Sequence, residues 1–297
     1  MSETPHTPSA SRVAAFVACC AIWGSTFLVI RIGNGTVAPA WAACLRLTLA
    51  SAVLWLWMAY RRQAAPRGAA LTAALQYGAL QFGLNFPLLY WGETVVPSGL
   101  SAVFYATAPI TLMLLARAFG LERLTRRKVA GALLAFTGVV LLFSSELSAQ
   151  VPLLPLGAVF ASTLVSPLGS TLLKLGPAQS AIGVNAVGCA LGAAMCLVWS
   201  FALGESHAVP HTAAAILPVV YLTLAGSLGA FLLWSWLVHH APLSKISYIA
   251  VIVPLVALGL GALLLHERVL PLTLAGSAVV LAGVVIGLGA PSGRATS

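Results

Sequence analysis

The sequence predicts an all-α integral membrane protein made of ten transmembrane helices in two inverted five-helix repeats. Of its 297 residues, 60% are hydrophobic and only 7% carry a charge, whereas about 25% of the residues of a soluble domain are charged. Long apolar runs recur along the whole chain, and about 20 apolar residues span the hydrocarbon core of a bilayer. Part of the first half also returns in the second half at a fixed spacing.

Ten apolar spans can be placed along the chain, and each is predicted to be a helix because backbone in lipid must satisfy its own hydrogen bonds. The spans cover about residues 13–32, 39–60, 70–92, 97–119, 128–145, 152–174, 180–203, 213–237, 243–265 and 270–289. The predicted organisation is a tail (1–12), a first repeat (13–146), an inverted second repeat (152–289) and a second tail (290–297).

The repeat is defined by residues that recur 145 positions apart, as in 242 − 97 = 145. The first copy contains Pro97, Pro109, Glu122, Arg123, Gly131 and Gly138. The second copy contains Pro242, Pro254, Glu267, Arg268, Gly276 and Gly283. Because each half has an odd number of spans, the second half is predicted to be inverted in the membrane.

The basic residues indicate how the spans are oriented. Most of them lie on one predicted side, namely Arg12, Arg61, Arg62, Arg67, Arg117, Arg123, Arg126, Arg127, Lys128, Lys174, Lys245 and Arg294. The opposite side holds Arg31 and Arg268. Basic residues concentrate on the cytoplasmic side, so both termini are predicted to be cytoplasmic, in a bacterial-type inner membrane. The net charge of +9 then reflects orientation and requires no nucleic-acid partner.

Inverted repeats are the architecture of secondary transporters, in which substrate binds near the midplane between the halves. An intramembrane enzyme would need a nucleophile and base, or metal ligands, at membrane depth. The carboxylates and histidines instead lie at span ends or in connections, and the five cysteines have no metal-ligand spacing. We therefore expect a transporter and not an enzyme, with no metal and no cofactor.

The first span contains Ala21-Ile22-Trp23-Gly24-Ser25-Thr26-Phe27, which resembles the opening of EamA-type transporters of the drug/metabolite transporter superfamily. The paired proline, Glu-Arg and glycine pattern resembles the end of each EamA repeat. The resemblance implies a cavity lined mainly by the first, third and fourth helices of each half. Similar members export amino acids, including aromatic ones. Leu168 stands where the first repeat has Trp23, so the cavity should be asymmetric.

The third span carries a polar stripe, since Tyr77, Gln81 and Asn85 recur every four residues on one helical face. Such a stripe would be costly against lipid, so it should face either a wet cavity or a neighbouring helix. The equivalent positions in the second half are Leu222, Gly226 and Ala230. A small, partly polar solute could lie between the two faces.

The other substrate-binding candidates come from three spans. They are Trp23, Ser25 and Thr26 in the first span, Ser101 and Tyr105 in the fourth, and Ser244 and Tyr248 in the ninth. Pro109 and Pro254 lie in mid-span, where proline kinks a helix, and are predicted to be matched hinges.

Two further features are charged. Arg46 lies inside a span, where an ionisable residue is a functional candidate. It could bind a substrate carboxylate, extend to the interface or satisfy backbone carbonyls. The Glu122-Arg123 and Glu267-Arg268 pairs are interpreted as structural, each ending a helix and fixing the next turn.

The predicted function is export of small metabolites, above all neutral or aromatic amino acids, by alternating access in a facilitative or exchange mode. A proton relay would need a carboxylate within the membrane, and Glu93 is the only weak candidate. The alternatives are a nucleotide-sugar or sugar-phosphate carrier and a proton-coupled drug/metabolite antiporter. As partners we expect the lipid bilayer and a small-molecule substrate (an amino acid or similar metabolite), and no nucleic acid. The Gly188-xxx-Gly192 and Gly283-xxx-Gly287 motifs permit close packing within a monomer or in a weak dimer.

Overall fold

The structure is a computed structural model that describes residues 10–144, 147, 150–264 and 271–290. Within these ranges the regular structure is entirely helical. Several features of interest in the sequence lie outside the described residues, namely Glu146, Glu267, Arg268, Arg294 and the far ends of both predicted tails.

The first half contains helices that follow the predicted spans closely. They are α1 (Ala10–Asn34), α2 (Pro39–Tyr60), α3 (Ala69–Gly78), η1 (Ala79–Leu84), α4 (Asn85–Gly92), α5 (Ser98–Tyr105), α6 (Ala108–Ala118) and α7 (Arg126–Leu142). The elements α3, η1 and α4 adjoin and form the third helix, whose middle is a π-helix. The fourth helix is interrupted between α5 and α6.

The second half repeats this order. Its elements are α8 (Leu153–Leu175), α9 (Ala181–Ala202), α10 (Ala213–Tyr221), η3 (Leu222–Ala230), α11 (Phe231–His240), α12 (Leu243–Ile246), α13 (Ile249–Leu264) and α14 (Pro271–Leu288). The eighth helix, formed by α10, η3 and α11, also has a π-helical middle. A π-helical segment thus interrupts the third helix of each half, and such segments are frequent at functional sites.

Seven of the described helical segments are long and apolar enough to cross a membrane. They are Pro39–Tyr60, Gly99–Ala118, Leu153–Leu175, Ala181–Ala202, Ala213–His240, Leu243–Leu260 and Pro271–Leu288. A shorter apolar helix covers Ala10–Thr26. The chain is therefore a multi-pass membrane protein, whereas the count of ten crossings stays a prediction.

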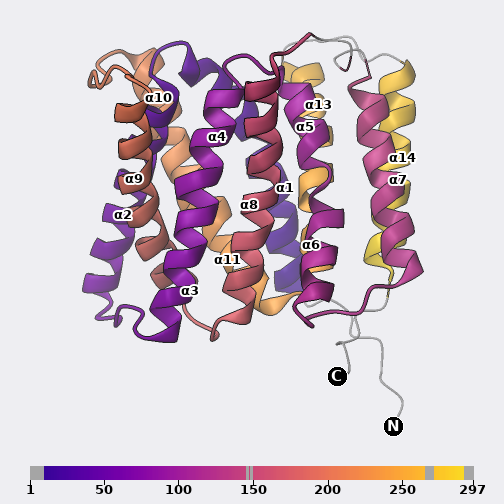
Figure 1. Ribbon diagram of the computed structural model, residues 1–297, viewed down its shortest axis with the longest axis horizontal. Helices are drawn as coiled ribbons and strands as arrows, with labels where there is room; N and C mark the ends of the chain where they lie inside the picture. The colour runs from indigo at the N-terminus through magenta and orange to yellow at the C-terminus, as the bar shows by residue number, and fades with distance from the viewer. Residues whose placement is uncertain (1–9, 145–146, 148–149, 265–270, 291–297) are drawn as a thin grey trace.

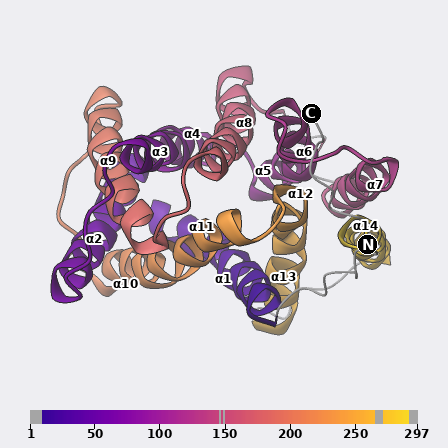
Figure 2. The same ribbon diagram turned by 90° about the horizontal axis from the view of Figure 1, so that it is seen from below.

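The helices run side by side, and their connections lie at the two ends of the bundle (Figure 1). Seen from one end, α1, α8, α11 and the third helix meet around the middle, while α7 and α14 pair at one edge (Figure 2). Basic side chains meet helix ends at one end of the bundle. The Arg12 guanidinium donates to the His240 carbonyl oxygen at 3.1 Å, and the Lys174 ammonium donates to the Ala241 carbonyl oxygen at 3.0 Å.

Glycines allow the helix backbones to approach closely. Gly78 of α3 faces Gly188 of α9, and a Cβ added to Gly78 would lie 2.8 Å from the Gly188 carbonyl oxygen. A Cβ added to Gly131 of α7 would lie 2.8 Å from the Gly283 carbonyl oxygen of α14. Small residues have this role in membrane helix pairs, so Gly188 and Gly283 pack within the chain.

The two mid-span prolines lie in different local settings. Pro109 is in the first turn of α6, directly after the interruption at residues 106–107, where a missing backbone N–H is tolerated. Pro254 lies inside α13, and the interruption of the ninth helix at residues 247–248 precedes that helix. The breaks are therefore not placed symmetrically. The role of both prolines as hinges stays a prediction.

Candidate functional site: a central cavity

A cavity of about 150 Å³ lies among the helices in the middle of the bundle. Its polar lining consists of Thr26, Arg46, Gln81, Asn85, Tyr90, Tyr105, Thr163, Ser166, Ser170 and Ser247. Its apolar lining includes Trp23, Ile30, Phe86, Leu89, Leu112, Phe231, Trp234, Ile249 and Val253. No aspartate or glutamate is among the lining residues that the structure describes. The cavity is thus aromatic and hydrogen-bonding, with one fixed charge.

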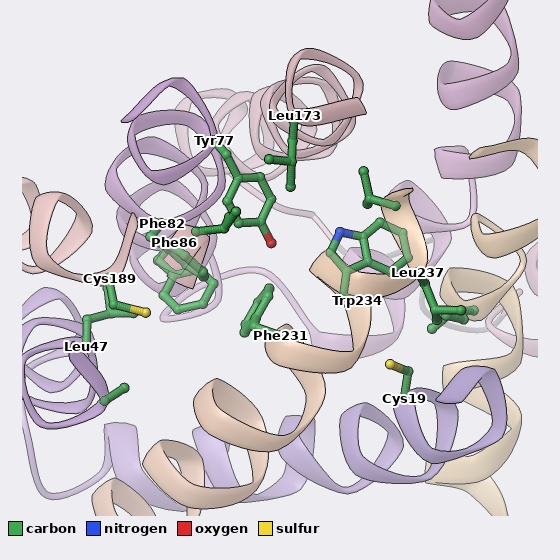
Figure 3. Packing of buried hydrophobic residues seen from close by; sticks show 14 of the residues in the cluster. Cys19, Leu47, Tyr77, Phe82, Phe86, Leu173, Cys189, Phe231, Trp234 and Leu237 are labelled. Atoms are coloured by element: carbon green, nitrogen blue, oxygen red, sulfur yellow. The ribbon is translucent and has the colours of Figure 1, made fainter. Parts of the chain in front are cut away.

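Aromatic side chains from α1 and α11 form one wall. The Trp23 ring lies 5.2 Å from the Phe231 ring and 5.5 Å from the Trp234 ring, measured between centroids. The indole N–H of Trp234 donates to the Ser170 hydroxyl of α8 at 3.1 Å, so this buried polar group is satisfied. Figure 3 shows Phe231 between Phe86 and Trp234, and the ring centroids of Phe86 and Phe231 lie 5.8 Å apart. This wall offers rigid apolar surface to a solute.

Two residues of the polar stripe of the third helix, Gln81 and Asn85, belong to the cavity lining. Gln81 accepts a hydrogen bond from the Ser166 hydroxyl at 2.8 Å through its side-chain oxygen. Asn85 accepts one from the Tyr105 hydroxyl at 2.6 Å, and the hydroxyl groups of Tyr105 and Ser162 lie 3.1 Å apart. Gln81, Asn85 and Tyr105 also line the cavity. Gln81 and Asn85 therefore both line the cavity and accept hydrogen bonds from neighbouring helices.

Arg46 of α2 is the charged group of the cavity, and only 3% of the residue is exposed. Its Nη1 donates to the Tyr90 hydroxyl at 2.7 Å, and its Nε donates to the Ser227 hydroxyl at 3.1 Å. The guanidinium carbon also lies 4.9 Å from the centroid of the Phe86 ring, a cation–π arrangement. The guanidinium donates to no backbone carbonyl among the described residues.

Gly226 makes room for this guanidinium. A Cβ added to Gly226 would lie 2.8 Å from Nη2 of Arg46, closer than a carbon and nitrogen normally approach. The small residues opposite the polar stripe therefore do not simply leave space for a solute, because Arg46 occupies part of it. Ser227, in the same π-helical segment, holds the guanidinium in place.

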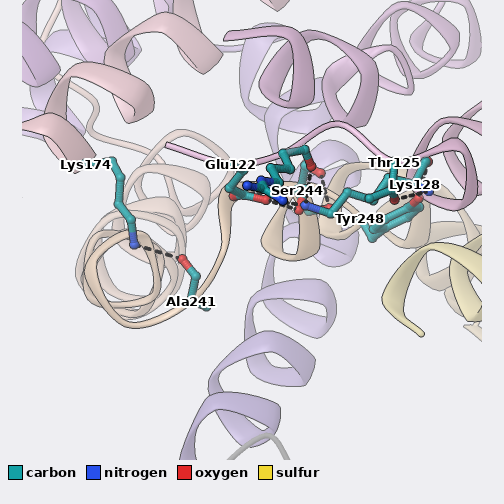
Figure 4. A network of polar contacts seen from close by, with 9 residues as sticks. Glu122, Thr125, Lys128, Lys174, Ala241, Ser244 and Tyr248 are labelled. Atoms are coloured by element: carbon teal, nitrogen blue, oxygen red, sulfur yellow. Dashed lines mark hydrogen bonds and ion pairs between the residues drawn. The ribbon is translucent and has the colours of Figure 1, made fainter. Parts of the chain in front are cut away.

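Some predicted site residues lie in the cavity wall and others do not. Trp23, Thr26, Gln81, Asn85 and Tyr105 line the cavity. Ser25 instead pairs with the Tyr221 hydroxyl at 2.5 Å. Tyr77 and Ser101 are fully buried outside the lining, and their hydroxyl groups have no hydrogen-bond partner among the described residues. Ser244 and Tyr248 belong to a polar network at one end of the bundle (Figure 4). Their contact with substrate stays a prediction.

The sequence interpretation missed the serines of α8. Ser162, Ser166 and Ser170 recur every four residues, the same signal that singled out the stripe of the third helix. Two of them line the cavity, and all three make hydrogen bonds to side chains around it. It also missed Tyr90 and Ser227. A lone arginine within a span needs polar partners, which was the available signal for those two residues.

A helical membrane bundle around a buried cavity of mixed polarity is the arrangement of a membrane transporter. The sequence profile of the EamA-like transporter family matches residues 11–144 and again residues 152–288. The chain therefore belongs to the EamA-like transporter family.

Known proteins resemble it over nearly their whole length. The chain is 27% identical over 276 residues to a probable amino-acid metabolite efflux pump of Escherichia coli (strain K12), covering 89% of this chain and 90% of that protein. It is 28% identical over 274 residues to a probable terminal-alkyne amino-acid exporter of Streptantibioticus cattleyicolor, covering 92% of each. A solved crystal structure has the same fold, with a TM-score of 0.80, 18% identity, and coverage of 94% of this chain and 96% of that one.

Proposed function

We propose that the protein exports small amphipathic metabolites, above all neutral and aromatic amino acids, across an inner membrane. The observation that carries this proposal is the central cavity, whose lining combines the indoles of Trp23 and Trp234 with the amides of Gln81 and Asn85. Its volume of about 150 Å³ suits a small solute, because pockets for drug-sized ligands measure roughly 300–1,000 Å³. Relatives that are named as amino-acid exporters support the same class of cargo.

The proposed topology has ten membrane crossings in two inverted halves, residues 13–146 and 152–289, with both termini in the cytoplasm. The twofold match to the family profile supports the division into halves. The start of α1 and the ends of α8 and α11 lie at one end of the bundle, together with Arg12 and Lys174. A concentration of basic residues at that end supports its assignment to the cytoplasmic side.

The proposed mode is facilitated diffusion or exchange by alternating access. A proton-coupled antiporter for cationic drugs would need a carboxylate in the cavity, and the described lining has none. A nucleotide-sugar or sugar-phosphate carrier would be served by several cationic groups around a phosphate, whereas Arg46 is the single one in the lining. Both alternatives are therefore weaker.

The test is solute efflux from proteoliposomes that contain the purified protein. Vesicles are loaded in turn with labelled phenylalanine, tryptophan, leucine and a hexose phosphate, and efflux is measured with and without a pH gradient. We expect amino-acid efflux above protein-free vesicles, with no requirement for a gradient. Gln81→Ala and Tyr105→Ala should reduce it while the protein stays folded. Transport of the hexose phosphate alone would refute the proposal.

A further inference from the structure

We propose that Arg46 is the anchor for a carboxylate of the cargo, and that the cavity accepts monoanionic carboxylates at least as well as zwitterions and disfavours amines. On this proposal, amino acids whose amino group is acylated or absent bind at least as well as the parent amino acids. The inference rests on the proposed function and specifies its substrate class. It is drawn from the charge, burial and hydrogen bonding of one arginine.

Arg46 is a buried cation without an anionic partner. Only 3% of the residue is exposed, and no carboxylate among the described residues lies within ion-pair distance of it. Its compensation comes from neutral groups, the Tyr90 and Ser227 hydroxyls and the Phe86 ring. A buried charge is normally paired, so a solute that brings a carboxylate would complete the site.

The guanidinium is held so that one nitrogen stays available. Tyr90 accepts from Nη1 and Ser227 accepts from Nε, whereas Nη2 makes no hydrogen bond among the described residues. A guanidinium presents several donors in a fixed plane that matches carboxylate geometry. The two hydroxyls and the Phe86 ring fix the plane, and Nη2 lies against Gly226, whose missing side chain makes room for it.

The described lining gives an ammonium group no carboxylate to pair with. The other polar lining groups are amides, hydroxyls and indoles, all of them neutral. The side-chain oxygens of Gln81 and Asn85 already accept hydrogen bonds from Ser166 and Tyr105. A zwitterion therefore gains at Arg46 but must bury its ammonium beside neutral groups and aromatic rings. An amine without a carboxylate is repelled by the positive charge of Arg46 and brings no group that binds it, so its entry is disfavoured.

Four solutes that share a phenyl ring separate these charge states. They are 3-phenylpropionate and N-acetylphenylalanine (anions), phenylalanine (zwitterion) and phenethylamine (cation). Binding to the detergent-solubilised protein is measured by tryptophan fluorescence, since Trp23 and Trp234 line the cavity, and transport is measured in proteoliposomes. We expect both anions to bind at least as tightly as phenylalanine, and phenethylamine to bind at least about tenfold more weakly. Phenethylamine binding as tightly as the anions, or phenylalanine binding tenfold more tightly than both, would overturn the proposal.

Two variants and a matched control test the role of Arg46 directly. Arg46→Gln should weaken the binding of both anions at least about tenfold. The affinity for phenethylamine should stay the same or increase. Gly226→Ala keeps the charge but places a methyl group against Nη2, so it should weaken the anions in the same direction even where Arg46→Gln fails to fold. Gly259→Ala is the control, because a Cβ at Gly259 of α13 has no neighbour within 4 Å. Wild-type anion affinity in Gly226→Ala would refute the anchor.

These experiments can refute the carboxylate anchor and the export function independently of each other. If anion binding depends on Arg46 but no amino acid or carboxylate crosses the membrane, the proposed export function fails and the anchor stands. If phenylalanine is exported but Gly226→Ala and Arg46→Gln bind and transport every carboxylate as the wild type does, the anchor fails and the export function stands.

Discussion

Glu122 and Ser244 are joined by two hydrogen bonds, because the Glu122 carboxylate accepts from both the backbone amide and the hydroxyl of Ser244. Glu122 lies in the connection after α6, and Ser244 lies in the first turn of α12. The ammonium of Lys128 donates to the same carboxylate at 2.8 Å (Figure 4). The carboxylate therefore ties the first half of the chain to the second at the end of the bundle that is rich in basic residues.

This junction should be stabilised by a charged Glu122. Burial raises the pKa of the carboxyl, but hydrogen bonds from Lys128 and Ser244 outweigh it and hold the pKa below its ordinary value. A lowered folded-state pKa gives stability that is present above the ordinary carboxyl range and lost as pH falls through the folded pKa. Thermal unfolding of the wild type should therefore shift downward below about pH 4.5.

The variants separate the charge from the hydrogen bonds. Glu122→Gln should lose this part of the pH dependence and be less stable than the wild type at pH 7. Lys128→Met leaves a buried carboxylate without its cation, a change that costs about 3–5 kcal/mol in buried pairs. Equal melting temperatures for Lys128→Met and the wild type at pH 7 would contradict the prediction.

At the contact between Gly78 and Gly188, a methyl group added to Gly78 should destabilise the protein more than one added to Gly188. A methyl group on Gly78 would collide with the Gly188 backbone, whereas one on Gly188 would lie 3.3 Å from its nearest atoms, in Gly78 and Phe82. We expect Gly78→Ala to destabilise the protein by about 1–3 kcal/mol and Gly188→Ala by less. Gly157→Ala, in open space on α8, is the control. Thermal unfolding in detergent measures all three, and the reverse order for the first two would contradict this packing.

The helices could be predicted from the sequence because apolar runs and their interruptions are local signals. The predicted span of 39–60 coincides with α2, and the predicted span of 152–174 is close to α8. The π-helical segments η1 and η3 were not predicted, because a π-helix has the same hydrophobic pattern as an α-helix at this length. Its presence depends on packing between helices.

The cavity was predicted in part. Gln81 and Asn85 were found from their spacing, since a polar stripe in an apolar span is a strong local signal. Arg46 was singled out, but its partners Tyr90 and Ser227 come from two other spans. Pairing across 44 and 181 positions leaves no pattern in a single sequence. Ser244 lies outside the cavity lining because it binds Glu122, and this contact between the two halves likewise leaves no local pattern in the sequence.

The Tyr105 hydroxyl should matter for transport more than for folding. It connects Asn85 of the third helix with Ser162 of α8, at the wall of the cavity. Tyr105→Phe removes the hydroxyl and keeps the ring, and each neutral hydrogen bond contributes about 0.5–1.5 kcal/mol. We expect amino-acid efflux to fall about 2- to 10-fold, and the melting temperature to fall by no more than the loss of these two hydrogen bonds accounts for. Tyr221→Phe is the matched control, because that hydroxyl pairs with Ser25 outside the cavity lining. Equal efflux in both variants would show that the hydroxyl of Tyr105 does not serve the substrate.

Glu93 tests whether transport is coupled to protons. It directly follows α4, and its Oε1 is buried without a hydrogen-bond partner among the described residues. Burial raises the pKa of this carboxyl from 4.5 to about 7. Between pH 4.5 and about pH 7, this carboxyl is protonated in the folded protein and ionised in the unfolded chain. The free energy of unfolding therefore falls as pH rises through this range, and the contribution of Glu93 is constant above it.

The melting temperature and the efflux activity of Glu93→Gln test the role of this carboxyl. At pH 8 Glu93→Gln should melt at a higher temperature than the wild type, whereas the difference should nearly vanish at pH 5, because Glu93 is then neutral in the folded state. In the facilitative mode, amino-acid efflux from proteoliposomes requires no pH gradient in either protein. Efflux that needs a gradient in the wild type, and loses that need in Glu93→Gln, would instead identify Glu93 as the proton-carrying group and make the protein a coupled transporter.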